Sequence, residues 1–239
     1  MLKHILTMMT VAVICTAPAK AADPVAVDLE LAFVVDASGS IDAEETMLQR
    51  QGYADALVHP KVLRAISGGF KQSIAVAYIE FAGLECVRVS IPWMRIGSAA
   101  EARAFGNKVL ALPMDDCWGG NAVGDALMLG IQSIETNNFE GTRRVIDISG
   151  DGPNTMGTPA SAARDLAVSR RITINALVID RPEMPDLDQY FKEVVIGGRR
   201  SFMLKVEDRK SFAQGILKKL ILEIADRDPD DQKAALNRR

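Results

Sequence analysis

Apolar and polar positions follow two different periods along this chain. Short runs rich in aliphatic and β-branched residues are typical of buried strands, and longer segments with apolar residues at every third or fourth position are typical of amphipathic helices. The predicted strands span residues 28–36, 73–81, 86–93, 143–149, 172–180 and 202–206. The predicted helices span residues 41–58, 98–112, 122–135, 159–169, 187–195 and 210–225.

Strands that alternate with helices predict an α/β fold: a doubly wound, mostly parallel central sheet with helices on both faces. Only a short segment around Gly83 separates the second and third strands, so we expect an antiparallel hairpin at one edge. A Ser98-x-x-Glu101 capping box marks the start of the next helix. His59-Pro60 is expected to end the first helix, which has these apolar residues on one face: Met47, Ala54, Leu57 and Val58.

The start of the chain has the pattern of a targeting segment. A basic start precedes an apolar run over residues 5–15, and Ala19-Lys20-Ala21 offers small residues at both positions that a signal peptidase reads. The run is too short to span a bilayer as a stable helix. We therefore predict a signal peptide over residues 1–21, cut after Ala21, and a mature protein that has no transmembrane segment and is periplasmic or secreted.

The composition of the chain excludes some classes of partner and some classes of catalytic or metal site. The net charge is −3, so the chain lacks the basic footprint of a nucleic-acid-binding protein. The two histidines are His4 and His59, and the first falls in the predicted leader, so a histidine-based triad or a zinc site of the usual type lacks its side chains. Residues 22–226 are predicted to form one domain, and the charged segment 227–239 has no apolar pattern and is expected to be disordered.

Cys86 and Cys117 are the cysteines that remain after removal of the leader. An even number of cysteines in an oxidising compartment favours a disulfide. Such a bond would close a loop of roughly 31 residues and stabilise the fold by about 3–4 kcal/mol in the chain-entropy description. Two free buried thiols are the alternative, and the spacing does not decide between the two.

Oxygen-rich loops follow the predicted strands. The first strand runs into Asp36, Ser38 and Ser40, and the strand over 143–149 runs into a turn that contains Asp151. Because the carboxyl ends of parallel strands meet at one edge of the sheet, these loops should lie together where doubly wound sheets bind ligands. Carboxylate and hydroxyl oxygens suit hard cations such as Mg²⁺, although Asp, Ser and Gly are also common turn and capping residues.

A third polar loop precedes the helix predicted over residues 122–135, in the segment GGNAVGDAL. Asn121 lies in this loop, and its amide oxygen is an acceptable ligand for a hard cation. Asp125 lies at the helix start, where it either supports a bound cation from outside its ligand shell or complements the helix dipole. Asp147, inside the fourth strand, is predicted to be solvated or to cap an element.

Together, the loops around Asp36, Asn121 and Asp151 resemble the three-loop metal-ion-dependent adhesion site of von Willebrand factor type A domains. The resemblance covers nearly the whole mature chain and implies that Ser38 and Ser40 contact the cation directly, whereas the aspartates act through water. It also implies that an acidic side chain of a protein partner completes the coordination of Mg²⁺, Mn²⁺ or Ca²⁺. The threonine of that family aligns with Asn121, which places cation affinity in doubt.

Longer strings narrow the resemblance further. EETMLQRQGYADAL, AVAYIEFAG, RRVIDISGDGPN and ITINALVI are similar to an exported bacterial family of von Willebrand A-like proteins known as a domain of unknown function. This resemblance implies a fold and a compartment, and it implies little about a biological role.

Three functions compete on these grounds. We expect a non-enzymatic module that recognises a protein partner through the cation. The first alternative is a fold with a degenerate or absent metal site that acts as a structural or interaction protein of the envelope. The second is a metal-dependent hydrolase with Asp36, Asp125 or Asp151 as general base, which the sequence supports least because it has no G-x-S-x-G, phosphate-loop or G-x-G-x-x-G motif.

Overall fold

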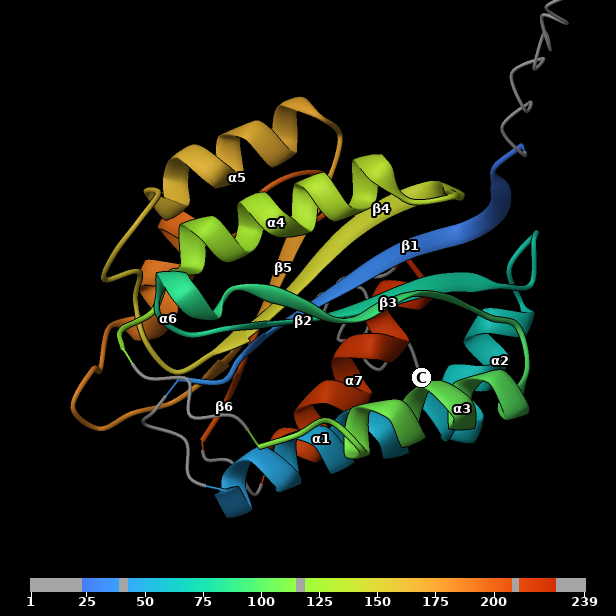
Figure 1. Ribbon diagram of the computed structural model, residues 1–239, viewed down its shortest axis with the longest axis horizontal. Helices are drawn as coiled ribbons and strands as arrows, with labels where there is room; N and C mark the ends of the chain where they lie inside the picture. Colours follow the sequence, from blue (N-terminus) through green and yellow to red (C-terminus); the bar gives the residue numbers. More distant parts are fainter. Residues whose placement is uncertain (1–22, 39–42, 115–118, 208–210, 227–239) are drawn as a thin grey trace, which may run out of the picture.

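The computed structural model describes residues 23–38, 43–114, 119–207 and 211–226 (Figure 1). Its centre is a six-stranded sheet with the order β3-β2-β1-β4-β5-β6. Neighbouring strands are parallel except for β2 and β3, which form an antiparallel pair at one edge. The strands are β1 (Val25–Asp36), β2 (Ile74–Phe81), β3 (Arg88–Ile96), β4 (Phe139–Gly150), β5 (Thr173–Ile179) and β6 (Met203–Val206).

Helices cover both faces of this sheet (Figure 1). One layer consists of α1 (Ala43–Val58), α2 (Pro60–Ser67), α3 (Ala99–Leu110) and α7 (Phe212–Ile224). The other consists of α4 (Val123–Thr136), α5 (Ala160–Ser169) and α6 (Leu187–Tyr190), which continues as a π-helical turn over Phe191–Val195. The predicted doubly wound α/β fold with an antiparallel edge hairpin is therefore confirmed.

The central strand β1 is covered by helices on both faces of the sheet. Its side chains alternate, with Leu31 and Phe33 in the core beneath α1 and α7, and Ala32 and Val34 in the core beneath α4 and α5. A strand covered on both faces has apolar residues at successive positions rather than at every second one. This rigid centre fixes where the carboxyl ends of β1 and β4 emerge.

Two local predictions were incomplete or wrong. His59-Pro60 ends α1 as expected, but Pro60 also opens α2, for which the side chain of His59 is the N-cap. Met47 does not share the buried face of α1, because it is 39% exposed, whereas Gln49 and Arg50 are buried in its place. Polar side chains thus occupy part of the helix face that packs on the sheet.

Several predictions fall outside the described residues: the signal peptide over 1–21, the tail over 227–239, Ser40 and Cys117. The extent of the domain, 22–226, stays a prediction for the same reason. Within the described part of the chain, no helix has both the length and the apolar character needed to cross a bilayer.

Candidate cation site at the carboxyl ends of the strands

Asp36 is the last residue of β1, and its side chain is buried, with a relative exposure of 1%. The chain keeps its direction for one more residue, because the Ala37 N–H donates to the carbonyl of Phe81 at 2.8 Å. It then turns, and the Ser38 N–H donates to Asp36 Oδ1 at 2.8 Å. Ser38 is buried as well, with a relative exposure of 3%.

Asp151 follows directly on β4, beside the end of β1, and is also buried. Burial and, to a smaller extent, the negative charge of Asp151 raise the pKa of Asp36 to about 6, against hydrogen bonds from Ser38 and from the backbone of Asp151. A side chain at Gly150 would place its Cβ 3.3 Å from Asp36 Oδ2. The two carboxylates therefore lie close enough at this edge of the sheet to repel each other.

The middle loop reaches the same place through Asn121. Its backbone exchanges two hydrogen bonds with Thr155, since the Asn121 N–H donates to Thr155 Oγ1 at 2.8 Å and the Thr155 N–H donates to the Asn121 carbonyl at 2.9 Å. A Cβ on Gly152 would lie 2.2 Å from Asn121 Nδ2, so the amide group lies against the residue that follows Asp151. Glycine at this position lets the two loops approach.

Asp36, Ser38, Asn121 and Asp151 are thus brought to one edge of the sheet, and their role as cation ligands stays a prediction. Asp125 lies in the same group of loops, but its carboxylate accepts hydrogen bonds from the N–H and the hydroxyl of Thr158, at 2.8 and 3.0 Å. In this structure it ties the start of α4 to the loop after β4.

The residues that hold the loops together were missed from the sequence. Asn154 caps α4 across space, because its Oδ1 accepts a hydrogen bond from the Gly124 N–H at 3.0 Å. The N–H of Asn154 in turn donates to the hydroxyl of Tyr190 at 3.1 Å. No local pattern reveals such caps, since donor and acceptor lie 30 or more residues apart.

Arg181 is the most unexpected member of this edge. It follows β5, and its Nη1 lies 3.6 Å from Asp151 Oδ2, with Nε 3.7 Å from Glu183. The guanidinium is about one third exposed. A positive charge therefore stands beside one of the predicted cation ligands, and its place directly after a strand end at this edge is the signal that was available in the sequence.

The oxygens present here fit a hard divalent cation. Asp36 Oδ2 is fully buried and has no hydrogen-bond partner among the described residues. A divalent cation would neutralise the repulsion between Asp36 and Asp151, and hydroxyl and amide oxygens beside them are ligands that Mg²⁺, Mn²⁺ and Ca²⁺ accept. The described part of the chain contains no cluster of three or more His, Cys, Asp or Glu side chains that could hold a metal, so a site here depends on neutral oxygens as well as on the two carboxylates.

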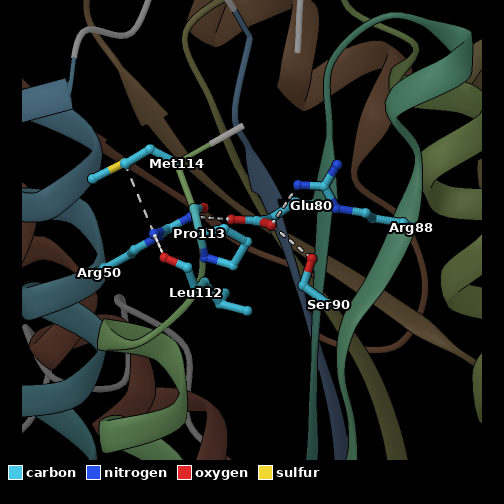
Figure 2. A network of polar contacts seen from close by, with 7 residues as sticks. All are labelled: Arg50, Glu80, Arg88, Ser90, Leu112, Pro113 and Met114. Carbon is cyan, nitrogen blue, oxygen red and sulfur yellow. Dashed lines mark hydrogen bonds and ion pairs between the residues drawn. The ribbon is translucent and has the colours of Figure 1, made fainter. Parts of the chain in front are cut away.

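A buried ionic cluster centred on Glu80 lies beneath this edge (Figure 2). Arg50 of α1 donates from Nη2 to Glu80 Oε1 at 2.9 Å and to the Pro113 carbonyl at 3.0 Å, and from Nη1 to the Leu112 carbonyl at 2.6 Å. The cluster therefore fixes the segment that leaves α3 and leads along the chain toward Asn121. Sequence reasoning missed it, because an arginine on a helix ordinarily indicates a solvated face.

Asp147 was predicted to be solvated or capping, and this prediction was wrong. Its side chain is fully buried, and Lys219 Nζ lies 2.5 Å from Asp147 Oδ1 and 2.5 Å from Glu223 Oε1. The predicted disulfide is described on one side only: Cys86 ends a 3-10 turn (Leu84–Cys86) and is disulfide-bonded, whereas Cys117 lies outside the described residues. The pairing of these two cysteines stays a prediction.

Solved structures with the same fold come from several organisms. Proximal thread matrix protein 1 from the mussel byssus is 16% identical, with a TM-score of 0.59 over 84% of this chain and 47% of its own, and a second structure of it has a zinc-occupied MIDAS motif. The vWF domain of the type V pili tip protein Mfa5 from Porphyromonas gingivalis is 11% identical, with a TM-score of 0.56 over 83% of this chain and 96% of its own.

The pilus adhesin SpaC from Lactobacillus rhamnosus GG is 13% identical, with a TM-score of 0.59 over 85% of this chain and 31% of its own. At these identities the similarity establishes the fold alone. The comparison with curated proteins found no match. One family, described as protein of unknown function (DUF1194), matches residues 26–228. The chain belongs to this family, and its domain has the von Willebrand factor type A fold.

Proposed function

We propose that this protein is an exported, non-enzymatic binding module that recognises a protein partner through a divalent cation. Asp36, Ser38, Ser40, Asn121 and Asp151 would hold the cation, with Mg²⁺ the preferred ion and Mn²⁺ or Ca²⁺ as substitutes. The single observation that carries the proposal is the buried Asp36 Oδ2, which lacks a hydrogen-bond partner among the described residues and lies beside a second carboxylate. The fold itself is shared with proteins described as adhesins and matrix proteins.

The balance of charged and neutral oxygens favours binding over catalysis. A cation held by two carboxylates and several neutral oxygens keeps a demand for negative charge, which a carboxylate from a partner meets. Catalysis would need a further general base beside the cation. Asp125 is the remaining acidic candidate, and its carboxylate is already engaged by both hydrogen-bond donors of Thr158. The proposed partner is therefore a protein that offers an acidic side chain.

Thermal unfolding with and without cation tests the cation site. Saturation at about one hundred times the dissociation constant should add about 2.7 kcal/mol of stability, so Mg²⁺ or Mn²⁺ should raise the melting temperature relative to chelator. Ser38→Ala should abolish this rise and leave the fold intact. Ser67→Ala, which removes a hydroxyl from the exposed end of α2, is the matched control and should keep the full response. A rise that survives Ser38→Ala would refute the ligand assignment.

A pull-down from cell-envelope extract tests the partner. The wild-type protein with Mg²⁺ should retain the partner, and chelator or Asp36→Asn should release it. Asp165→Asn is the matched control, because Asp165 is an exposed residue of α5 and belongs to none of the three loops. Retention that is the same with chelator and with Mg²⁺ would contradict cation-mediated recognition. Turnover in phosphatase and esterase assays that Asp36→Ala removes would contradict the non-enzymatic assignment.

Arg181 favours a second candidate, an interaction module that works without a cation. Its guanidinium lies 3.6 Å from Asp151 and supplies positive charge at the place where a cation would supply it. Arg181→Gln distinguishes the two candidates. If the site binds a cation, removal of this competing charge should tighten Mg²⁺ binding, whereas in a cation-free module the same change should lower the melting temperature and Mg²⁺ should have no effect on either protein.

A further inference from the structure

A cavity lies at the end of the sheet opposite the candidate cation site. Its volume is about 360 Å³, and it is enclosed by the amino-terminal parts of β4 and β5, the segment before β6 and the carboxyl end of α7. Arginines dominate its lining: Arg143, Arg144, Arg171, Arg199 and Arg200. Apolar side chains, among them Val168 and Phe202, complete the wall. A cavity of this size is in the range of small-molecule sites.

The acidic residues of the cavity do not balance these charges. Asp226 lies between Arg143 and Arg200, at 3.6 Å from each guanidinium, and Glu223 is engaged by Lys219. The structure contains no ion pair for Arg144, Arg171 or Arg199 among the described residues. The lining therefore has more arginines than carboxylates, and Glu30, outside the lining, partly offsets the charge of Arg144.

Part of the arginine cluster has an evident structural role. Arg143 donates to the carbonyls of Glu223 and Ile224, at 2.7 and 2.9 Å, and Arg200 donates to the carbonyl of Asp226 at 2.9 Å. These two side chains thus satisfy the last carbonyls of α7, where the helix dipole favours positive charge. This role does not require Arg171 or Arg199, neither of which makes a side-chain hydrogen bond within the described residues.

The backbone is strained where it presents the cluster. Arg171 and Arg200 have φ values of +58° and +54°, in the left-handed region that costs about 1–2 kcal/mol for a residue with a side chain. Burial lowers the pKa of Arg143; the charges of Asp226, Glu223 and Asp28 oppose this, and the smaller effect of Arg199 adds to it. Backbone strain persists when the surrounding structure imposes it, and such places are often ligand sites.

Guanidinium groups bind carboxylates and phosphates through paired hydrogen bonds, and their fixed fork geometry makes them suited to these oxyanions. The apolar wall beside them is suited to a hydrocarbon or aromatic group. We propose that this cavity binds a small organic anion, with its phosphate or carboxylate group at Arg171 and Arg199 and its apolar part against Val168 and Phe202. The proposal does not depend on the cation site.

Titration calorimetry with phenyl phosphate and with inorganic phosphate, at constant ionic strength in chloride, tests this site. Phenyl phosphate should bind, and more tightly than inorganic phosphate, because its ring adds the apolar contact. The double variant Arg171→Gln/Arg199→Gln should weaken binding at least tenfold. Arg103→Gln/Lys108→Gln, which removes the same charge from α3, is the matched control and should bind as the wild type does. Equal binding by the double variant and the control would overturn the proposal.

Amide chemical shifts of the wild-type protein give a readout that needs no variant. Phenyl phosphate should shift the signals of Thr173, Asn175 and Phe202, and leave those of Asp36 and Asp151 unchanged. Absence of binding at millimolar concentration, or shifts confined to other surfaces, would overturn the proposal.

The chain itself also contains carboxylates of this kind, those of Asp228, Asp230 and Asp231, which follow Asp226 in sequence. Changing all three to asparagine distinguishes this source from a free ligand. If the three carboxylates compete for the arginines, phenyl phosphate should bind more tightly to the triple variant, and if a free anion is the sole occupant, its affinity should be unchanged. A loss of binding in this variant would contradict the assignment to the arginines.

Discussion

Glu80 and Lys219 are each the centre of a buried ionic cluster, and both clusters lie on the face of the sheet that α1, α3 and α7 cover. Around Glu80, two arginines and a serine hydroxyl face one carboxylate, since Arg88 and Ser90 donate to Oε2 at 3.2 and 2.6 Å while Arg50 donates to Oε1. Around Lys219, one ammonium faces two carboxylates, those of Asp147 and Glu223. The two clusters therefore have opposite imbalances of charge.

The consequences of this difference are visible in the unsatisfied atoms. Both oxygens of Glu80 have partners, and Arg50 Nη1 and Nη2 also donate to carbonyls of the segment after α3, although the buried Nε of Arg50 has no hydrogen-bond partner among the described residues. By contrast, Asp147 Oδ2 and Glu223 Oε2 have no hydrogen-bond partner among the described residues. Burial, followed by the charge of Glu223, raises the pKa of Asp147. The Glu80 cluster fixes a loop, whereas the Lys219 cluster leaves negative charge buried with too little compensation.

The largest effect is expected from Lys219→Met. This change leaves two carboxylates buried side by side without a cation, and removal of one partner from a buried ion pair costs about 3–5 kcal/mol. We expect a loss of about 4–5 kcal/mol in the free energy of unfolding, measured by urea denaturation at pH 7. Lys218→Met is the matched control, because Lys218 is the exposed neighbour on the same helix, and it should change stability by less than about 0.5 kcal/mol.

A loss after Lys219→Met as small as that of the control would mean that the two carboxylates do not need the ammonium. The comparison of the two clusters would then fail at its first step. Restoring the balance provides a second check, because adding Asp147→Asn to Lys219→Met should recover part of the lost stability.

Arg50→Met should have the next largest effect, about 3 kcal/mol in the free energy of unfolding. The loss should be smaller than that of Lys219→Met because Glu80 keeps Arg88 and Ser90 as partners. The same variant should weaken the Mg²⁺-induced rise in melting temperature, since the segment that Arg50 holds leads toward Asn121. Arg64→Met, on the exposed face of α2, is the control and should affect neither quantity. A full Mg²⁺ response in Arg50→Met would separate the Glu80 cluster from the cation site.

The two ionic clusters also show which features could not be predicted from the sequence. The apolar pattern of β1 and the alternation of strands and helices predicted the fold, because the burial of an apolar strand or helix face can be recognised from residues that are close together in sequence. Asp147 was predicted to be solvated or capping, and Arg50 was not singled out, because each is charged and its partner lies far along the chain, 30 residues away for Glu80 and 72 for Lys219. A charged residue is buried when its partner is buried with it, and the sequence does not state which distant residues meet.

The loops of the candidate cation site also contain some residues that could be predicted from the sequence and others that could not. The positions of Asp36 and Asp151 could be predicted because Asp36 ends an apolar strand and Asp151 directly follows one, and the topology of a doubly wound sheet then brings strand ends together. Asn154, Thr155 and Thr158 could not, because they hold the loops by hydrogen bonds between segments rather than within one. Arg181 follows a strand end as the two aspartates do, but it is a cation, and it was overlooked in a search for ligands of a cation.

Asp147→Asn should have a smaller effect, and one that depends on pH. The folded-state pKa of Asp147 lies above its ordinary value, so the folded protein binds this proton more tightly than the unfolded chain does. The stability that this proton provides is present below about pH 4 and is lost as pH rises through the folded-state pKa. The advantage of Asp147→Asn over the wild type should therefore grow as pH rises from about 4, to at most about 2 kcal/mol at neutral pH.

Urea denaturation of Asp147→Asn and the wild type at several pH values between 4 and 8 measures this difference. Asp165→Asn is the control, because its carboxylate is 70% exposed and the curve should run parallel to that of the wild type. Parallel curves for Asp147→Asn as well would mean that Asp147 is already neutralised by Lys219, and that the imbalance of this cluster has no energetic consequence.

The smallest effect should come from Ser90→Ala, about 1 kcal/mol in the free energy of unfolding. The variant removes a 2.6 Å hydrogen bond to Glu80 Oε2, but Arg88 still donates to that oxygen and Arg50 to the other. In a double-mutant cycle with Arg50→Met, the loss caused by Ser90→Ala should increase, because Glu80 then depends on its remaining partners. Strict additivity of the two losses would show that the partners of Glu80 act independently. The larger number of donors around Glu80 would then not explain why its cluster tolerates the loss of one partner better than the cluster around Lys219 does.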